Sequence, residues 1–342
     1  MDITRRRFVA SSAAVAGAGV VLPVAPTGSL QLGCQTLPYR GQPLARALEG
    51  IRKAGYEFVM PFRTHAGQPV FTPALSAAAR ASLRRQFSDA GLEPFMSFVG
   101  LTKDPATPEG LVVYQGELDL CREFGIRTVV GIGPWYYTQF PNVPKRARDW
   151  EQECAIYYKA LEQAVRHAES IGVTITLKPH TGITATARAC LEVVKRIISE
   201  RLKICWDAGN VSFYEGIHPD PDLPDLAPHV KSVCIKDHLG GRAEANFPTP
   251  GTGQVDHELM FRILLAAGFN GPVAVERVDG REDAAKMDPL VIDQRIAAAR
   301  KFLVRVIETS KSGPHAASPG PLTLTTTAAR APGRCGGSSH SR

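Results

Sequence analysis

Residues 172–210 read GVTITLKPHTGITATARACLEVVKRIISERLKICWDAGN, and their pattern is that of a strand, a loop, a helix and a second strand. Apolar and polar residues alternate from Val173 to Leu177, which is typical of a strand. The next apolar pattern predicts a helix over 189–198, followed by a strand over 202–206. Two strands joined through a helix in this way run parallel, so this segment predicts an α/β fold.

Polar residues follow both of these strands directly. Lys178 and His180 come after the first strand, and Asp207 and Asn210 come after the second. In parallel α/β barrels the active site lies at the carboxyl ends of the strands. We therefore expect these side chains to carry function.

The alternation of strand and helix extends through the chain. Residues 219–228 are too rich in proline for a long helix and predict a short or irregular connection. No GxGxxG follows the first strand, which disfavours the alternative of a doubly wound open sheet. The prediction is therefore a single (β/α)8 TIM barrel over residues 30–310. Strands are expected at 30–36, 56–61, 93–99, 127–132, 173–177, 202–206, 230–236 and 272–276, and helices at 43–54, 73–90, 111–124, 147–171, 189–198, 256–267 and 289–309.

The net charge of +7 is concentrated in the two ends of the chain. Residues 1–29 carry +2 and residues 311–342 carry +4, which leaves a nearly neutral body. A neutral body lacks the basic surface that nucleic-acid binding needs, so we expect no nucleic-acid partner. Residues 311–342 are rich in Gly, Pro, Ser and Thr without apolar periodicity, and predict a disordered tail.

The first residues are typical of an export signal. Thr4-Arg5-Arg6-Arg7-Phe8-Val9 precedes an apolar run to Val24, which resembles a twin-arginine signal within residues 1–29. The run is shorter than the roughly 18 to 20 residues of a spanning helix, so no stable membrane span is expected. The predicted partner is the twin-arginine translocase and the predicted location is the periplasm, with membrane retention if the signal is not cleaved.

Charged residues also follow the later predicted strands. Strand geometry places alternate residues on one side, so these side chains can share one mouth of the barrel. Carboxylates with imidazoles suit a divalent cation such as Mn²⁺, Mg²⁺, Co²⁺ or Zn²⁺. Structural alternatives stay open: Asp207 can cap the turn ending at Asn210, Glu276 can pair with Arg277 or Lys236, and His180 can be a loop histidine. The full set is Lys178, His180, Asp207, Lys236, Asp237, His238 and Glu276.

Four motifs in order resemble the xylose isomerase-like TIM-barrel superfamily, which includes sugar phosphate isomerases and epimerases. They are Trp206-Asp207-Ala208-Gly209-Asn210, Val233-Cys234-Ile235-Lys236-Asp237, Pro250-Gly251-Thr252-Gly253-Gln254-Val255-Asp256, and Ala267-Gly268-Phe269-Asn270-Gly271 leading to Val275-Glu276. The resemblance implies a barrel, a divalent metal and proton chemistry on a sugar-like substrate.

Two departures from the family pattern concern the metal. The family usually has Glu at the position of Lys178 and His at that of Cys234, both as metal ligands, whereas Asp207 and Glu276 are retained. Three alternatives are open. His180 and His238 replace the missing ligands, the Lys178 ammonium takes the place of the cation, or Cys234 ligates as a thiolate. The expected metal ligands are His180, Asp207 and Glu276.

The expected catalytic residues are Lys178, His180 and Glu276, with Lys178 stabilising an enediolate or relaying a proton. A Schiff-base role for Lys178 is a further alternative, although neighbouring carboxylates oppose it by stabilising the charged amine. Aromatic residues after the fourth strand can stack on a sugar or plug the rim. The expected substrate contacts are Gln35, His65, Trp135, Tyr136, Lys236 and His238.

The sequence therefore predicts an isomerase- or epimerase-type enzyme that enolises a carbohydrate-like substrate with a divalent metal at the barrel rim. One alternative is a lyase or hydrolase acting on an oxidised (keto) sugar, which would use the same enolate. A second alternative is a non-catalytic periplasmic sugar-binding barrel that has lost its metal.

Overall fold

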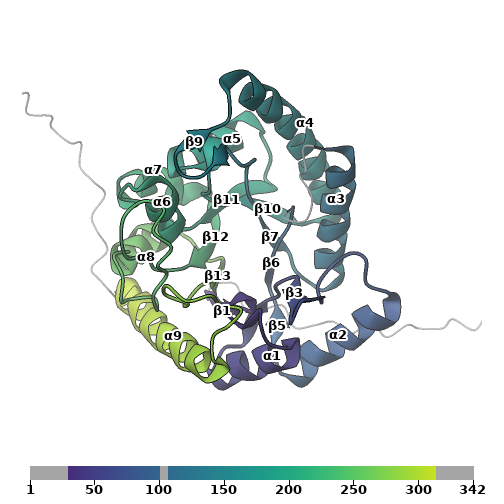
Figure 1. Ribbon diagram of the computed structural model, residues 1–342, viewed down its shortest axis with the longest axis vertical. Helices are drawn as coiled ribbons and strands as arrows, with labels where there is room; N and C mark the ends of the chain where they lie inside the picture. The colour runs from purple at the N-terminus through teal and green to yellow at the C-terminus, as the bar shows by residue number, and fades with distance from the viewer. Residues whose placement is uncertain (1–29, 101–106, 313–342) are drawn as a thin grey trace, which may run out of the picture.

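The computed structural model describes residues 30–100 and 107–312, which form a ring of parallel strands surrounded by helices (Figure 1). The sheet order is β5-β2-β1-β13-β12-β11-β10-β7-β6. The two ends of this order, β5 and β6, are separated along the chain by Phe95 alone, so the sheet comes round on itself as a nearly closed barrel. The strands are β1 (Gln31–Gln35), β2 (Phe58–Met60), β5 (Glu93–Pro94), β6 (Met96–Phe98), β7 (Thr128–Gly131), β10 (Thr174–Leu177), β11 (Leu202–Trp206), β12 (Val230–Ile235) and β13 (Pro272–Val275).

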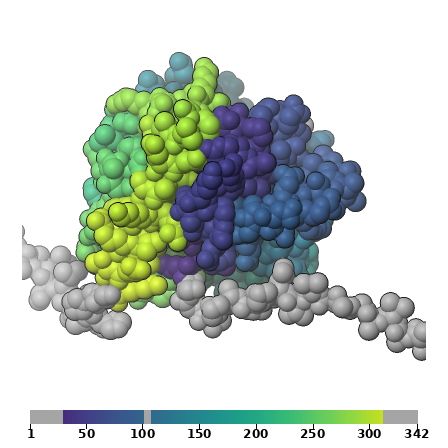
Figure 2. All heavy atoms as spheres, turned by 90° about the horizontal axis from the view of Figure 1, so that it is seen from below, coloured from purple at the N-terminus to yellow at the C-terminus, as the bar shows by residue number. Residues whose placement is uncertain are grey.

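Helices cover the outside of this barrel, and Figure 2 shows the last long helix packed against the first. The α-helices are α1 (Leu44–Lys53), α2 (Ala77–Asp89), α3 (Pro108–Glu123), α4 (Ala147–Ile171), α5 (Ala187–Arg196), α6 (Ala208–Glu215), α7 (Leu223–Leu226), α8 (His257–Ala266) and α9 (Pro289–Ser312). Short 3-10 helices are η1 (Leu37–Tyr39), η2 (Gly182–Thr184), η3 (Asp220–Asp222) and η4 (Ala227–His229), and two small hairpins pair β3 (Thr64–His65) with β4 (Gln68–Pro69) and β8 (Tyr137–Gln139) with β9 (Val143–Pro144).

The predicted α/β barrel is confirmed, with a strand at each of the eight expected places. The third strand is divided into β5 and β6, and residues 219–228 form the short irregular connection that their prolines predict. Helix α6 was not predicted. Helix α9 runs to Ser312, two residues past the predicted boundary at 310, while the predicted export signal and the rest of the predicted tail lie outside the described residues.

The barrel interior explains where the charged residues lie. An inner cluster of buried side chains, which includes Cys205, Cys234 and Ala274, fills the barrel. This cluster is separate from the larger core under the helices. Side chains alternate along a strand, so the residues two positions later point into the barrel again. Those residues are Asp207, Lys236 and Glu276. Register alone therefore places a charged layer above an apolar one.

Candidate active site

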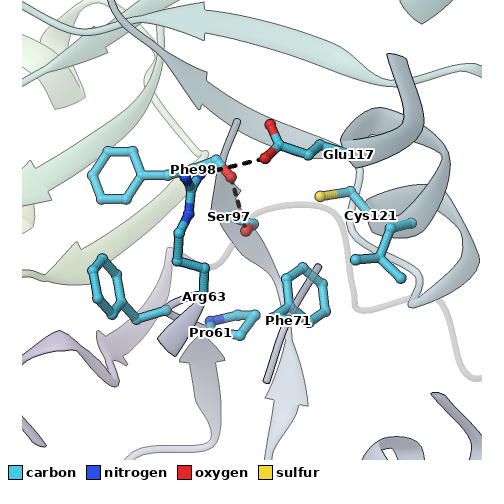
Figure 3. A pocket seen from close by; sticks show the side chains of 9 residues that line it. Pro61, Arg63, Phe71, Ser97, Phe98, Glu117 and Cys121 are labelled. Atoms are coloured by element: carbon cyan, nitrogen blue, oxygen red, sulfur yellow. Dashed lines mark hydrogen bonds and ion pairs between the residues drawn. The ribbon is translucent and has the colours of Figure 1, made fainter. Parts of the chain in front are cut away.

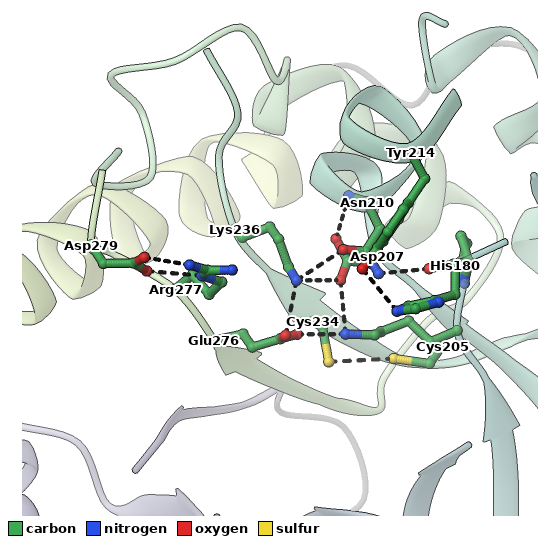
Figure 4. A network of polar contacts seen from close by, with 12 residues as sticks. His180, Cys205, Asp207, Asn210, Tyr214, Cys234, Lys236, Glu276, Arg277 and Asp279 are labelled. Atoms are coloured by element: carbon green, nitrogen blue, oxygen red, sulfur yellow. Dashed lines mark hydrogen bonds and ion pairs between the residues drawn. The ribbon is translucent and has the colours of Figure 1, made fainter. Parts of the chain in front are cut away.

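Four buried side chains meet at the carboxyl ends of four neighbouring strands, and we call them the charge tetrad (Figure 4). They are Lys178 after β10, Asp207 after β11, Lys236 after β12 and Glu276 after β13. Glu276 Oε2 accepts a hydrogen bond from Lys178 Nζ at 2.8 Å, and Oε1 accepts one from Lys236 Nζ at 2.8 Å. Asp207 Oδ2 lies 3.3 Å from both ammonium nitrogens. Each carboxylate therefore faces both lysines.

Helix α6 fixes the position of Asp207. Asp207 is the N-cap of this helix, and its Oδ1 accepts the backbone N–H of Asn210 at 2.9 Å. The Asn210 side chain accepts from Lys236 Nζ at 2.9 Å and donates to the Pro179 carbonyl at 2.6 Å. The structural alternative for Asp207, a cap ending at Asn210, thus coexists with its place in the tetrad. One carboxylate oxygen starts the helix and the other faces the lysines.

Burial and neighbouring charges shift the pKa of Lys178, Glu276 and Asp207. Burial alone would lower the pKa of Lys178, but Glu276 and Asp207 raise it well above its usual value. Burial opposes ionisation of Glu276, yet the two lysines bring its pKa below the usual range. Burial raises the pKa of Asp207 despite both lysines. A strongly held charge on Lys178 disfavours the Schiff-base alternative, because that chemistry needs a neutral amine.

His180 lies beside the tetrad and pairs with a residue that the sequence did not predict. Its Nε2 lies 2.8 Å from the hydroxyl of Tyr214, which α6 contributes. Burial, followed by repulsion from Lys178 and Lys236, lowers the pKa of His180 to about 3. Burial raises the pKa of Tyr214 to about 12. Both groups are therefore neutral near pH 7, and an imidazole of this kind can donate or accept a hydrogen bond.

The residues around the tetrad do not fit a divalent cation as they are placed. Within residues 30–100 and 107–312, no group of three or more His, Cys, Asp or Glu side chains is arranged to hold a metal ion. The carboxylate oxygens of Glu276 are both bonded to ammonium groups, and His180 Nε2 is bonded to Tyr214. Burial and the neighbouring Cys205 raise the pKa of Cys234 well above its usual value, which disfavours a thiolate ligand.

Aromatic side chains form one wall of the mouth. The ring of Trp135, 38% exposed, lies 5.4 Å from that of His180 and 6.0 Å from that of Tyr214, measured between centroids. Tyr136 lies further out, where it packs on Trp150 and lines a surface groove with Ile183 and Glu215. Trp135 is therefore placed to contact a ligand above the tetrad, whereas Tyr136 belongs to the neighbouring groove.

Gln35 is a predicted substrate contact at the end of the first strand of the barrel. It is fully buried at the end of β1, and the register of Cys34 with Val275 places it beside Glu276 on the face that points into the barrel. Neither its amide oxygen nor its amide nitrogen finds a hydrogen-bond partner among the described residues. Buried amides normally have partners, so this one has hydrogen-bonding capacity to offer a ligand.

The other two predicted histidine contacts are held by the protein. His65 is bonded through Nδ1 to the carbonyls of Tyr39 and Gln42 and through Nε2 to the Thr36 hydroxyl, so its contacts are structural. His238 Nε2 lies 2.9 Å from the Glu244 carbonyl, which leaves Nδ1 as an acceptor with no partner in the described part of the chain. Of these two, His238 alone keeps a nitrogen available.

Asp237 organises a loop. Its Oδ1 accepts the backbone N–H groups of His238 and Val255, and its Oδ2 accepts those of Gly251 and Gly253, all at 2.9 to 3.0 Å. These four bonds tie the loop after β12 to the barrel rim. The motif around Gly251 and Gly253 therefore has a structural role, because these residues bind Asp237 through their backbone N–H groups.

Arg277 is a further residue that the sequence did not single out as functional. It pairs with Asp279, and its guanidinium lies 4.1 Å from the centroid of the Phe247 ring. The Lys236 ammonium lies 5.7 Å from the same ring. The expected alternative pairing of Glu276 with Arg277 gives way to the pairing of Glu276 with Lys236.

A second cavity lies beside α3, with Arg63 and Glu117 3.4 Å apart on its wall (Figure 3). Phe98 lines this cavity, and its ring centroid is 4.6 Å from Lys178 Nζ. Glu117 also accepts the backbone N–H of Gly100. The charged side chains of this cavity thus bind each other and the backbone, so the charge tetrad is the stronger candidate for chemistry.

Curated relatives share part of the sequence. The chain is 26% identical to an inosose dehydratase of Clostridium beijerinckii over 171 residues, which cover 45% of this chain and 54% of that protein. It is 24% identical to an inosose dehydratase of Klebsiella pneumoniae over 159 residues, which cover 40% of this chain and 50% of that protein. The chain thus spans about half the length of the curated relatives it matches.

Solved structures share the fold at low sequence identity. A D-psicose 3-epimerase from Clostridium cellulolyticum H10, solved with D-tagatose, has a TM-score of 0.65 at 15% identity, covering 81% of this chain and 99% of that one. A xylose isomerase-like TIM-barrel protein from Mycobacterium smegmatis, solved in complex with magnesium, has a TM-score of 0.64 at 15% identity, covering 82% and 97%.

The profile of the family described as xylose isomerase-like TIM barrel matches residues 48–301, which is more than half of the chain. This match covers β2 to β13 and all four residues of the charge tetrad. The chain belongs to the xylose isomerase-like TIM-barrel family.

Proposed function

We propose that this protein is a sugar-modifying enzyme that removes a proton from the carbon next to a carbonyl group of a carbohydrate-like substrate. The observation that carries the proposal is the buried charge tetrad at the carboxyl end of the barrel. Removing such a proton creates an enolate oxygen, and buried hydrogen-bond donors stabilise this charge far better than water does. The epimerases and dehydratases among the similar proteins support the same class of substrate.

The tetrad supplies complementary groups for this reaction. An ammonium has three N–H donors, so Lys178 retains donor capacity beyond its bond to Glu276 and can hold the enolate oxygen. Asp207 Oδ2 accepts no hydrogen bond among the described residues and is the carboxylate oxygen free to receive a proton. Glu276, bonded through both oxygens, holds the two lysines in position.

Surrounding residues would orient the substrate. Gln35 offers an unpaired amide, His180 has a buried Nδ1 without a partner among the described residues, and Trp135 provides an exposed ring. A sugar presents hydroxyl groups at its edges and C–H groups on its faces, which suits this combination of polar atoms and an aromatic wall.

An isomerase or epimerase and a dehydratase share the enolate and differ in the fate of this intermediate. The first returns the proton to carbon, whereas the second expels the hydroxyl group of the adjacent carbon, which takes up a proton and leaves as water. The partial likeness to inosose dehydratases favours including this lyase reaction as a second candidate.

The test is solvent-deuterium exchange followed by NMR, with a panel of ketohexoses and inososes. With wild-type protein, deuterium should be incorporated at the carbon next to the carbonyl. With Lys178→Met, this incorporation should not occur. Lys203→Met is the matched control, because Lys203 is a half-buried lysine of β11 that pairs with Glu200 outside the tetrad. If calorimetry shows that a sugar binds but NMR shows no exchange, the result would contradict the proposed enzymatic activity and favour a sugar-binding barrel.

We also propose that the protein is exported by the twin-arginine route, supported by Arg5-Arg6-Arg7 ahead of an apolar run. Within the described residues no helix is long and apolar enough to cross a membrane. Replacing Arg5 and Arg6 with Lys should keep the protein in the cytoplasm of a host with this pathway. Periplasmic recovery of that variant would contradict the proposal.

A further inference from the structure

We propose that the ammonium groups of Lys178 and Lys236 take the place of a divalent cation, so that this centre holds its two carboxylates together without binding a metal. The inference rests on the proposed function only for the use of the centre in catalysis. Its central claim concerns which cation lies between Asp207 and Glu276, and this claim is tested by ion binding alone.

The contacts of the carboxylates carry the first step. Glu276 gives one oxygen to each lysine at 2.8 Å, and Asp207 Oδ2 lies 3.3 Å from both. Magnesium, manganese or calcium would need several of these oxygens at about 2.0 to 2.6 Å. An ion there would stand against two ammonium groups. Metal binding would therefore require at least one lysine to leave.

Neither lysine is free to leave easily. Lys178 is 3% exposed and Lys236 is 5% exposed. Lys236 also donates to Asn210 at 2.9 Å, and Asn210 is fixed by the carbonyl of Pro179. Lys178 Nζ also lies over the ring of Phe98, at 4.6 Å from its centroid. Each ammonium thus has partners besides the carboxylates, as expected of a permanent member of the site.

Charge balance supports the same conclusion. Two carboxylates and two ammonium groups sum to zero, which suits a buried site where an unpaired charge is costly. Adding a divalent ion would leave two net positive charges in the same space. The lysine pair and a metal are therefore mutually exclusive, and the lysines are covalently part of the chain.

The difference also defines what the centre offers a substrate. A metal binds oxygen as a Lewis acid, whereas the lysine pair offers N–H donors from β10 and β12, the two strands that flank β11. A ketone or enediolate oxygen can take hydrogen bonds from this pair. We therefore assign to Lys236, expected from the sequence as a substrate contact or a partner of Glu276, the role of half of the buried cation.

The first experiment measures metal in the wild-type protein. Protein purified without chelator is incubated with Mn²⁺, passed through a desalting column and analysed by mass spectrometry for Mn, Mg, Co and Zn. We expect less than about 0.1 ion per chain and no change of Tm in millimolar Mn²⁺, because a ligand that does not bind cannot stabilise the fold. One retained ion per chain, or a clear rise of Tm, would overturn the proposal.

The second experiment changes the charge of the site. Lys178→Glu leaves three carboxylates facing one ammonium, so this variant should retain about one Mn²⁺ per chain and gain roughly 5 °C in Tm when Mn²⁺ is added. Lys178→Met removes the ammonium without adding a ligand and should retain none. Lys203→Glu, which adds the same charge outside the tetrad, is the control for non-specific binding.

The outcomes separate this inference from the proposed function. A metal-free wild type without solvent exchange would refute the function and keep the lysine centre. Exchange that EDTA abolishes and Mn²⁺ restores would keep the function and refute the lysine centre. If Lys178→Glu fails to fold with or without Mn²⁺, the wild-type metal measurement decides alone.

Discussion

Asp207 and Asp237 follow neighbouring strands of the same barrel, and both are fully buried, yet they do different work. Asp237 uses both oxygens to bind four backbone N–H groups of one loop. Asp207 uses one oxygen to start α6 and turns the other towards two lysines. A buried carboxylate whose oxygens are both bonded to backbone N–H groups builds structure, whereas one with an oxygen that accepts no hydrogen bond among the described residues is available for chemistry.

Asp237→Ala should give the largest effect on stability. It removes four charge-assisted hydrogen bonds and leaves their N–H donors without a buried partner, which we expect to cost about 4 kcal/mol of unfolding free energy. Urea denaturation measures it, with Asp237→Asn as the milder variant because it keeps one acceptor oxygen. A loss below about 1 kcal/mol would show that the loop does not depend on this carboxylate.

Asp207→Asn should reduce activity strongly and stability less than Asp237→Ala does. The amide keeps an oxygen for the N-cap of α6 but cannot receive a proton, so solvent exchange should fall by about 100-fold or more. Two lysines then share one carboxylate, and we expect a loss of about 2 kcal/mol by urea denaturation. Exchange at the wild-type rate would contradict the role of Asp207 and remove its contrast with Asp237.

The pH dependence sharpens the comparison, because the centre around Asp207 contains a histidine that stays neutral when folded. The folded-state pKa of His180 is about 3, below its unfolded value of 6.5. Between these values the unfolded chain binds a proton that the folded chain does not, so stability falls as the pH falls from 6.5 towards 3. When the pH is lowered from about 7 to about 5, we expect the unfolding free energy of His180→Gln, measured by urea denaturation, to fall by about 2 kcal/mol less than that of wild type. Equal losses would contradict this assignment.

Gln35→Met should have the smallest effect on stability and still affect the substrate. A buried amide without a hydrogen-bond partner among the described residues contributes little to folding, so the change should stay within about 1 kcal/mol. If the amide binds a substrate oxygen, KM should rise by about tenfold, which corresponds to about 1.4 kcal/mol. An unchanged KM would remove Gln35 from the site.

Most of the fold could be predicted because each strand carries a short apolar pattern and each long helix a periodic one. Helix α6 was missed because residues 208–215 mix small, polar and aromatic residues without a clear apolar face. The local signals were there: Asp207 is a favourable N-cap, and Gly216 ends the helix in the left-handed conformation. The proximity of these signals to the strand end concealed a helix of eight residues.

The sequence predicted the residues of the site better than the ion pairs between them. Period-two geometry brought Asp207, Lys236 and Glu276 to one mouth, as the structure has them. The pairing of Lys236 with both carboxylates depends on distances across the barrel, which sequence spacing does not contain. Tyr214 was missed because it lies on α6, and a residue on an unpredicted helix has no predicted position.

Trp135 provides a fluorescent reporter at the mouth of the barrel. The chain contains three tryptophans, of which Trp206 is fully buried below the rim and Trp150 lines the neighbouring groove with Tyr136. Trp135, partly exposed and edge-on to His180 and Tyr214, is the one whose surroundings a ligand over the tetrad would change. Its fluorescence can therefore report binding without a coupled assay or a coloured product. Candidate sugars can be screened by titration before any of them is known to react.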